Sequence, residues 1–255
     1  MKGFFMAFAM YSRIPVPQIE WKEENRRLAL CFFPLIGLLI GSLSVFWYCL
    51  CKVLQIGSLM FSAIAAAIPV IVTGGIHLDG FCDVQDAKAC LGSREKSLEV
   101  MSDSHIGAFA AIHLAIYIVV QIGIFSEIKN MRLMIICSLG YVLSRAWSGL
   151  AAVTFPCAKK QGTLQSFVKP AHKSITILVE LLYLFAVFAV MLKIDVIIGL
   201  AVFFISGLTF IYYRHFSVKR FGGITGDLAG YFLQICELSV TAAAVGANLI
   251  LEALQ

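Results

Sequence analysis

Three aspartates follow one another at helical spacing directly after a long apolar run. They are Asp79, Asp83 and Asp86, in the segment GGIHLDGFCDVQDAK at residues 74–88. Spacings of four and three residues place the carboxylates within roughly 60° of one another on one helix face. Because like charges on such a face repel, the pattern indicates a divalent cation, and oxygen-only ligands favour Mg²⁺, Mn²⁺ or Ca²⁺ over zinc. The alternative is a solvated helix face that carries acids by chance.

Two further segments carry polar residues suited to a charged ligand. In RFGGITGDLAG, residues 220–230, the consecutive glycines let the backbone approach a ligand closely. Asp227 then opens the last apolar run, either as a helix cap or as a second metal carboxylate. In MSDSHIGAFA, residues 101–110, Asp103 is expected either to cap the next apolar helix or to contact the metal site.

Basic side chains near these segments suit phosphate. Arg13 follows an apolar stretch in YSRIPVP, where two prolines stiffen the backbone. Its guanidinium therefore suits phosphate binding. The alternative is that Arg13 anchors the chain at the membrane surface. Lys159 and Lys160 lie in the basic loop 156–173. Such charge runs are usually solvated faces or topology signals, but an anionic substrate would need them on the same side as the acidic stripe.

The elements that position these residues are membrane-spanning helices. The chain is 60% hydrophobic and 14% charged, with a mean hydropathy of +0.89, well above soluble domains. Seven apolar runs are long enough to cross about 30 Å of hydrocarbon. They lie near residues 28–51, 58–77, 107–125, 131–153, 174–192, 194–213 and 228–252. We therefore expect an all-α, polytopic integral membrane bundle that forms one domain over residues 1–255.

The distribution of Lys and Arg orients this bundle. Fifteen of the 20 basic residues fall on the N-terminal side, namely Lys2, Arg13, Lys22, Arg26, Arg27, Lys88, Arg94, Lys96, Lys159, Lys160, Lys169, Lys173, Arg214, Lys219 and Arg220. Four fall on the other side, at Lys52, Lys129, Arg132 and Lys193. The positive-inside rule then places the N-terminus and the acidic stripe in the cytoplasm. The same bias explains the net charge of +5 without a nucleic-acid partner.

Three charged residues fall inside the expected spans. Arg145, Glu180 and Glu237 are costly at membrane depth, which makes them functional candidates by default. Glu237 lies about ten residues into the last span, where an ionic partner is expected, whereas Glu180 lies near enough to its helix start to reach the interface.

Several motifs together resemble the cobalamin synthase family, whose members are adenosylcobinamide-GDP ribazoletransferases. They are HLDGFCDVQDAK, MSDSHIGAFA, GGITGD, the YSRIPVP arm and FFPLIG at the start of the first span. The resemblance covers nearly the whole chain. Three positions depart from the family pattern: Ala87 and Ala110 stand where a glycine is usual, and Lys159 stands where arginine is expected. The last change keeps the charge but loses the bidentate fork of arginine.

The resemblance implies a reaction and a role for each motif. The family joins adenosylcobinamide-GDP to α-ribazole, or to α-ribazole 5′-phosphate, with release of GMP and dependence on Mg²⁺. It implies that the three aspartates of the stripe hold Mg²⁺ and that Asp103 or Asp227 completes the metal shell or takes the hydroxyl proton. The implied substrate-binding residues are Arg13, His77, Arg94, Lys159, Gly222, Gly223 and Thr225. His77 would bond a carboxylate or a ribose hydroxyl, or serve only as a polar residue at a helix boundary.

The implied setting is the cytoplasmic (inner) membrane of a prokaryote, with the active-site loops facing the cytoplasm and a homo-oligomer allowed. Two other functions fit parts of the pattern. A membrane prenyltransferase also uses Mg²⁺ and acidic motifs, but GGITGD has only one acid. A secondary transporter would use Glu180 and Glu237, but the chain has no recognisable inverted repeat.

Overall fold

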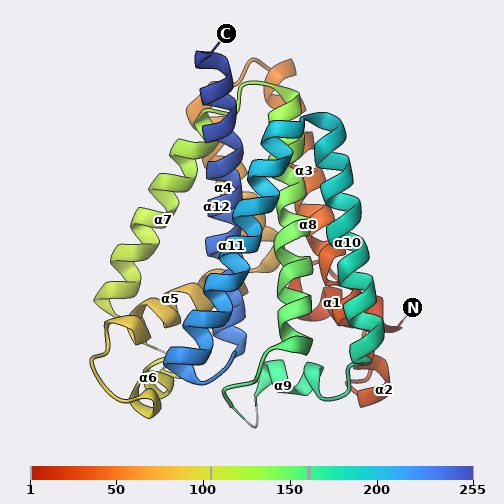
Figure 1. The fold of residues 1–255 in the computed structure, drawn as a ribbon, viewed down its shortest axis with the longest axis vertical. Helices are drawn as coiled ribbons and strands as arrows, with labels where there is room; N and C mark the ends of the chain where they lie inside the picture. The colour runs from red at the N-terminus through yellow and green to blue at the C-terminus, as the bar shows by residue number, and fades with distance from the viewer. Residues whose placement is uncertain (1, 104, 160–161, 255) are drawn as a thin grey trace.

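The described part of the chain forms a bundle of long helices joined by short helices at one end. The computed structural model describes residues 2–103, 105–159 and 162–254. The helices are α1 (Lys2–Tyr11), α2 (Glu23–Arg26), η1 (Leu30–Phe32), α3 (Phe33–Val53), α4 (Ser58–Thr73), α5 (Ile76–Ala89), α6 (Arg94–Val100), α7 (Ala108–Ser126), α8 (Met131–Thr154), α9 (Thr163–Val168), α10 (Lys173–Ile194), α11 (Val196–Phe221) and α12 (Gly226–Ala253). Figure 1 shows α5, α6 and α9 together at the lower end and the C-terminus at the upper end.

Six helices of the described residues are long and apolar enough to cross a membrane: α3, α7, α8, α10, α11 and α12. Helices α4 and α5 pass the same test together as one bent span, which allows up to seven spans. The six long helices coincide with six of the seven expected spans, so the all-α membrane bundle is confirmed. The C-terminal bound expected for the span 58–77 is wrong. Helix α4 stops at Thr73, and Gly74 and Gly75 take φ values of +65° and +81°, which favour glycine. The chain bends there by 96°, so α5 runs across the end of the bundle.

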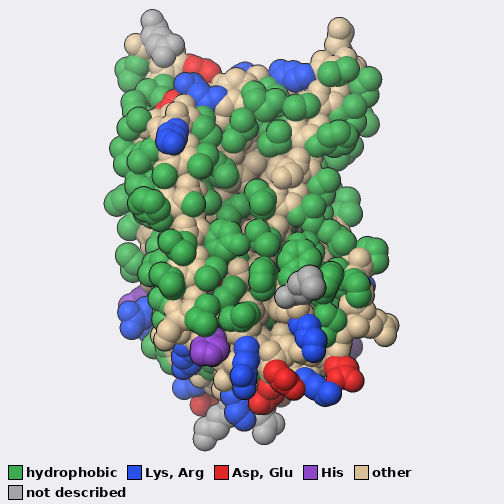
Figure 2. All heavy atoms as spheres, turned by 90° about the vertical axis from the view of Figure 1, so that its right-hand side faces the viewer, with side chains coloured by type: hydrophobic (Ala, Val, Ile, Leu, Met, Phe, Trp, Pro, Cys, Tyr) green, Lys and Arg blue, Asp and Glu red, His purple; other side chains and the backbone are tan. Residues whose placement is uncertain are grey.

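Charge is distributed along the bundle as its sequence predicts. In Figure 2, hydrophobic side chains cover the middle of the visible face, and charged side chains gather mainly at the lower end. The opposite end carries Lys52, Lys129, Arg132 and Lys193, each at or beside the end of a long helix. Lys160 lies outside the described residues. The apolar belt and the two charged ends are the pattern of a protein that spans a bilayer.

An ion pair joins α8 to α12 inside the bundle. Arg145 Nη1 lies 2.6 Å from Glu237 Oε1, and both side chains are almost fully buried. The same nitrogen donates to the carbonyl of Tyr141 at 3.0 Å. Because breaking a buried pair typically costs 3–5 kcal/mol, this contact gives the two costly residues a structural role. An ionic partner was expected for Glu237, and the structure identifies it as Arg145.

Candidate functional site

Helix α5 crosses the first turns of α12 at two glycines. A Cβ atom at Gly80 would lie 2.7 Å from the Asp227 carbonyl oxygen, and one at Gly230 would lie 2.9 Å from the His77 carbonyl oxygen. Any side chain at either position would therefore force the two backbones apart. This crossing places the start of α12 beside the acidic stripe, whose three aspartates do lie on one helix, α5.

The carboxylates at this crossing influence one another electrostatically. The pKa of Asp83 is raised to about 7. Burial is the largest cause, the nearby carboxylates of Asp79, Asp227 and Asp86 add to it, and Lys159 acts in the opposite direction. Asp79 is exposed and Asp83 is half-buried. Like-charge crowding of this kind favours either a bound proton or a bound cation. The site therefore has an excess of negative charge for which Lys159 is a nearby counter-charge.

Asp86 has a different task from its two neighbours on the stripe. Its Oδ2 accepts a hydrogen bond from the Gly107 N–H at 2.6 Å, and its Oδ1 accepts one from the Ala110 N–H at 2.9 Å. These N–H groups belong to the N-terminus of α7, where a negative charge is favourable. Asp86 thus caps α7 from another helix, and its role as a metal ligand stays a prediction.

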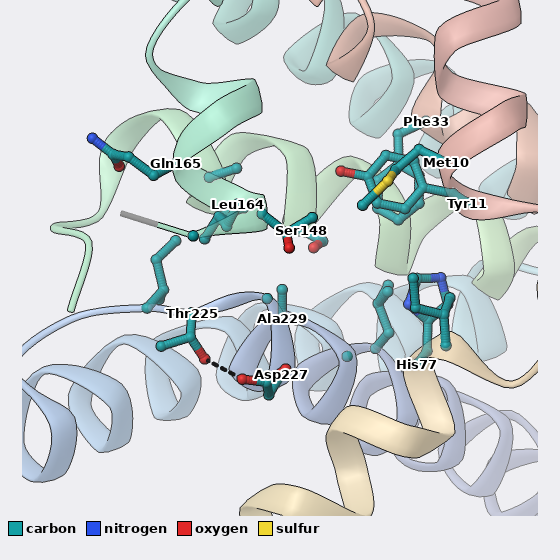
Figure 3. A pocket seen from close by; sticks show the side chains of 18 of the residues that line it. Met10, Tyr11, Phe33, His77, Ser148, Leu164, Gln165, Thr225, Asp227 and Ala229 are labelled. Carbon is teal, nitrogen blue, oxygen red and sulfur yellow. Dashed lines mark hydrogen bonds between the residues drawn. The ribbon is translucent and has the colours of Figure 1, made fainter. Parts of the chain in front are cut away.

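The start of α12 is capped by Thr225. Its Oγ1 accepts a hydrogen bond from the Leu228 N–H at 3.1 Å, as a helix N-cap does. Asp227 lies in the first helical turn, 3.4 Å from the same hydroxyl, which donates to its Oδ2 (Figure 3). The alternative that Asp227 caps this helix is therefore wrong. Its half-buried carboxylate is available for other chemistry.

A cavity of about 350 Å³ opens on one side of these carboxylates. It lies between the end of α1, the start of α5, the last turns of α8, α9 and the first turns of α12, and Figure 3 shows side chains from these elements around it. Asp79, Asp227 and Lys159 line its polar part, while Tyr11 and Phe33 line an apolar part. The cavity thus joins a charged region to an apolar, aromatic one.

A second, more open groove of about 400 Å³ lies on the other side of α5. Asp79, Asp83, Leu78, Ile106 and Leu114 are among its lining residues. Asp79 lines both the cavity and this groove. Asp79 therefore lies between two hollows and lines each of them, whereas Asp83 lines only the groove.

The remaining predicted residues lie around the cavity or farther away. His77 lines the cavity and is 5% exposed, and Lys159 Nζ donates to the Ser102 hydroxyl at 2.6 Å. Arg13 is exposed and packs over Gly74 at the corner between α4 and α5. It is not among the residues that line the cavity or the groove.

The glycine pair and Arg94 contact other parts of the protein. The Arg94 guanidinium lies against Gly222, and Gly223 packs against the backbone of residues 156–158. Ile224 forms a parallel bridge with Cys157. Close approach at these glycines thus serves the protein's own chain, while their predicted role in binding stays a prediction.

Asp103 does not cap the following helix, so that alternative is wrong. The N-cap of α7 is Gly107, and Asp103 Oδ1 instead accepts the His105 N–H at 3.0 Å. Asp103 is exposed, and it is not among the residues that line the cavity or the groove. Its predicted roles as base or metal contact stay predictions.

The carboxylates at the crossing suit a Mg²⁺ ion that takes most of its ligands from water and substrate. Among the described residues, no three His, Cys, Asp or Glu side chains are already arranged as a metal-ligand group. Mg²⁺ usually keeps several waters and takes only one or two protein carboxylates together with substrate phosphates. The exposed Asp79 and the crowded Asp83, which present oxygen donors only, match that requirement.

Sequence reasoning missed the residues that create the crossing and the apolar part of the cavity. Gly80 and Gly230 each sit inside a helix, where glycine costs about 1 kcal/mol relative to alanine. A helical glycine next to a candidate carboxylate is a signal of close packing that was available in the sequence. Tyr11 and Phe33 belong to the motifs YSRIPVP and FFPLIG, but their spacing gave no sign that the two rings line a cavity, since aromatic residues are common throughout the apolar runs.

Comparison with known proteins agrees with the resemblance of the motifs. The family described as cobalamin-5-phosphate synthase matches residues 3–245. A protein of Lachnoclostridium phytofermentans named adenosylcobinamide-GDP ribazoletransferase is 39% identical, over 96% of this chain and 94% of its own length. Proteins of the same name from Clostridium botulinum (strain Alaska E43) and Desulfitobacterium hafniense are each 30% identical, over 93% of this chain and 94% of their own lengths. No solved structure matches. This chain belongs to the cobalamin-5-phosphate synthase family.

Proposed function

We propose that this protein transfers the adenosylcobinamide-phosphoryl group of adenosylcobinamide-GDP to a ribose hydroxyl of α-ribazole or of α-ribazole 5′-phosphate. The 5′-hydroxyl can serve as acceptor only in free α-ribazole, because the 5′-oxygen is already esterified in the phosphate, so a step shared by both acceptors uses a ring hydroxyl of the ribose. The single observation that carries the proposal is the meeting of Asp79, Asp83 and Asp227 with Lys159 beside a cavity at one end of a membrane bundle. The names of the relatives supply the substrates. Phosphoryl transfer needs this kind of site, because the protein mainly positions the reactants and balances charge.

The reaction balances without an external oxidant or reductant. The acceptor hydroxyl oxygen forms a bond to the phosphorus that carries cobinamide, and the bond from that phosphorus to the bridging oxygen breaks. GMP leaves with the bridging oxygen, and the hydroxyl proton passes to a carboxylate. Asp227 is our candidate for that base, because it lines the cavity and Thr225 frees it from capping.

Asp79 and Asp83 are the residues that would hold Mg²⁺. When bound, Mg²⁺ would neutralise charge on the diphosphate and on the departing phosphate. Lys159 lines the cavity and would contact a phosphate oxygen as a point charge. A lysine at this position can follow a phosphate that moves during the reaction, whereas an arginine would hold it by a fixed bidentate contact.

The two rival functions lack such support. A prenyltransferase with a second acidic motif would need more than the single acid of GGITGD. A transporter that used intramembrane carboxylates would need Glu180 and Glu237 together, but Glu237 is paired with Arg145. Glu180 is fully buried against Gly149, so the expectation that it reaches the interface is wrong. The relatives carry the name of neither class.

We also propose that the end with α5, α6 and α9 faces the cytoplasm of a prokaryotic cell. The bias of Lys and Arg supports this orientation, and soluble nucleotides would reach the site from that side. A thiol reagent that does not cross membranes should label Lys129→Cys in intact cells but should label Lys169→Cys only after lysis; both residues are exposed. Labelling of Lys169→Cys in intact cells would contradict the orientation.

Asp227→Asn tests the proposed base. Removal of the charge should lower GMP release from adenosylcobinamide-GDP and α-ribazole at least about 100-fold, the scale of positioned acid–base groups. The melting temperature should change little, because Thr225 caps α12. Asp103→Asn is the matched control and should keep near-normal turnover. The reverse result for the two variants would make Asp103 the better candidate.

The pH dependence of Mg²⁺ binding tests the role of Asp83. In the metal-free protein its pKa is raised to about 7, so the carboxyl is mostly protonated below that pH and must lose its proton to bind a cation. Mg²⁺ affinity measured by calorimetry should therefore increase from about pH 6 to about pH 8. Asp83→Asn should bind Mg²⁺ weakly and lose this dependence. Equal wild-type affinity at both pH values would contradict the role.

A further inference from the structure

The two hollows beside Asp79 differ in shape and chemistry. The cavity lies beneath α9 and reaches between α1, α5, α8 and α12, whereas the groove opens along α5 toward the start of α7. Asp79 and Ile76 line both. Two ligands could thus approach one carboxylate from different sides without sharing a binding surface.

The inner part of the cavity suits an apolar aromatic ring. Tyr11, Phe33 and His77 form a connected aromatic wall: the Tyr11 and His77 rings are stacked with centroids 6.3 Å apart, and the Phe33 ring meets His77 edge-on at 5.9 Å. Met10, Leu30 and Leu233 complete the apolar surface. In Figure 3 the side chains of Met10, Tyr11, Phe33 and His77 lie together at one side of the cavity. Aromatic ligands bind such walls by stacked and edge-on contacts.

The volume of the cavity excludes adenosylcobinamide-GDP, the larger of the two substrates. A cavity of about 350 Å³ is at the lower end of the range for small-molecule sites. It can enclose a single nucleoside but not a corrin macrocycle with its nucleotide chain. The larger substrate must therefore lie mainly outside this cavity.

Chemistry then distinguishes α-ribazole from the guanosine of adenosylcobinamide-GDP. Guanine carries several donors and acceptors on its edges, and enclosing them against Met10, Leu30, Phe33 and Leu233 would leave polar groups unsatisfied. The base of α-ribazole, a methylated benzimidazole, has one free ring nitrogen and otherwise apolar edges. The His77 side chain at the wall is 5% exposed, and its Nε2 has no hydrogen-bond partner among the described residues. An imidazole ring is a suitable neighbour for that single polar atom.

Resting on the proposed function, we propose that the cavity binds α-ribazole by its base and that adenosylcobinamide-GDP approaches Asp79 from the groove. The base would pack against Tyr11, Phe33 and His77, and the ribose hydroxyl would point to Asp227 and Asp79 at the polar part of the cavity. Attack and departure in phosphoryl transfer occur roughly in line. Hollows on two sides of one carboxylate meet that requirement.

The test compares one variant in each hollow. Ala229 lines the cavity, where Figure 3 shows its side chain, and Ile106 lines the groove and is 62% exposed. Ala229→Leu narrows the cavity and should raise the KM for α-ribazole at least about tenfold, with the KM for adenosylcobinamide-GDP within about twofold of wild type. Ile106→Trp obstructs the groove and should give the reverse pattern.

A thiol-protection measurement on the wild-type protein covers the case of an inactive variant. Cys157 lines the cavity and is partly exposed. With labelling resolved by peptide mass spectrometry, α-ribazole alone should slow alkylation of Cys157. Adenosylcobinamide-GDP alone should leave the rate of that alkylation unchanged.

The outcomes separate this inference from the proposed function. If wild-type protein releases no GMP from the two substrates, the proposed function fails. If the wild type is active but Ala229→Leu raises the KM for adenosylcobinamide-GDP alone, or both KM values equally, the assignment of the cavity is overturned. Protection of Cys157 by adenosylcobinamide-GDP and not by α-ribazole would overturn it as well.

Discussion

The close crossing of α5 over the start of α12 is the constraint on which the site depends. Gly80 and Gly230 let the two backbones touch, and this contact places Asp227 beside Asp79 and Asp83 although almost 150 residues separate them in the chain. The 96° bend at Gly74 and Gly75 makes the crossing possible, because it turns α5 across the end of the bundle. The acidic stripe is thereby held at the polar end of the bundle, where a nucleotide can arrive.

The polar residues at this end divide structural and chemical work. Asp86 caps α7 and Thr225 caps α12, so the helix termini are satisfied without Asp79, Asp83 or Asp227. Those three carboxylates crowd one another, and burial first, then this crowding, raises the pKa of Asp83. Folding tolerates the repulsion, and a cation bound with the substrate diphosphate would relieve it. Proteins often keep such local strain where they bind ligands.

Sequence reasoning predicted the elements better than the contacts between them. Apolar run lengths gave the six long spans, and the spacing of Asp79, Asp83 and Asp86 gave a helix. The same reasoning extended a span through residues 74–77, because hydropathy does not register the bend at two glycines. It left capping open as one alternative for Asp103 and Asp227 because they precede apolar helices, whereas caps depend on geometry that spacing alone does not fix. Asp86 as a cap for α7 depends on tertiary packing and has no local signal.

The most direct test of the central claim is GMP release by Gly80→Ala. A methyl group at residue 80 would lie 2.7 Å from the Asp227 carbonyl oxygen, so α5 and α12 must separate and the carboxylates with them. We expect turnover to fall at least about tenfold, since misplacement of about 1 Å can cost 100-fold, while the protein stays folded in detergent. Gly123→Ala, in α7 with no atom within 4 Å of the added carbon, should keep wild-type turnover. Normal GMP release by Gly80→Ala would contradict the account.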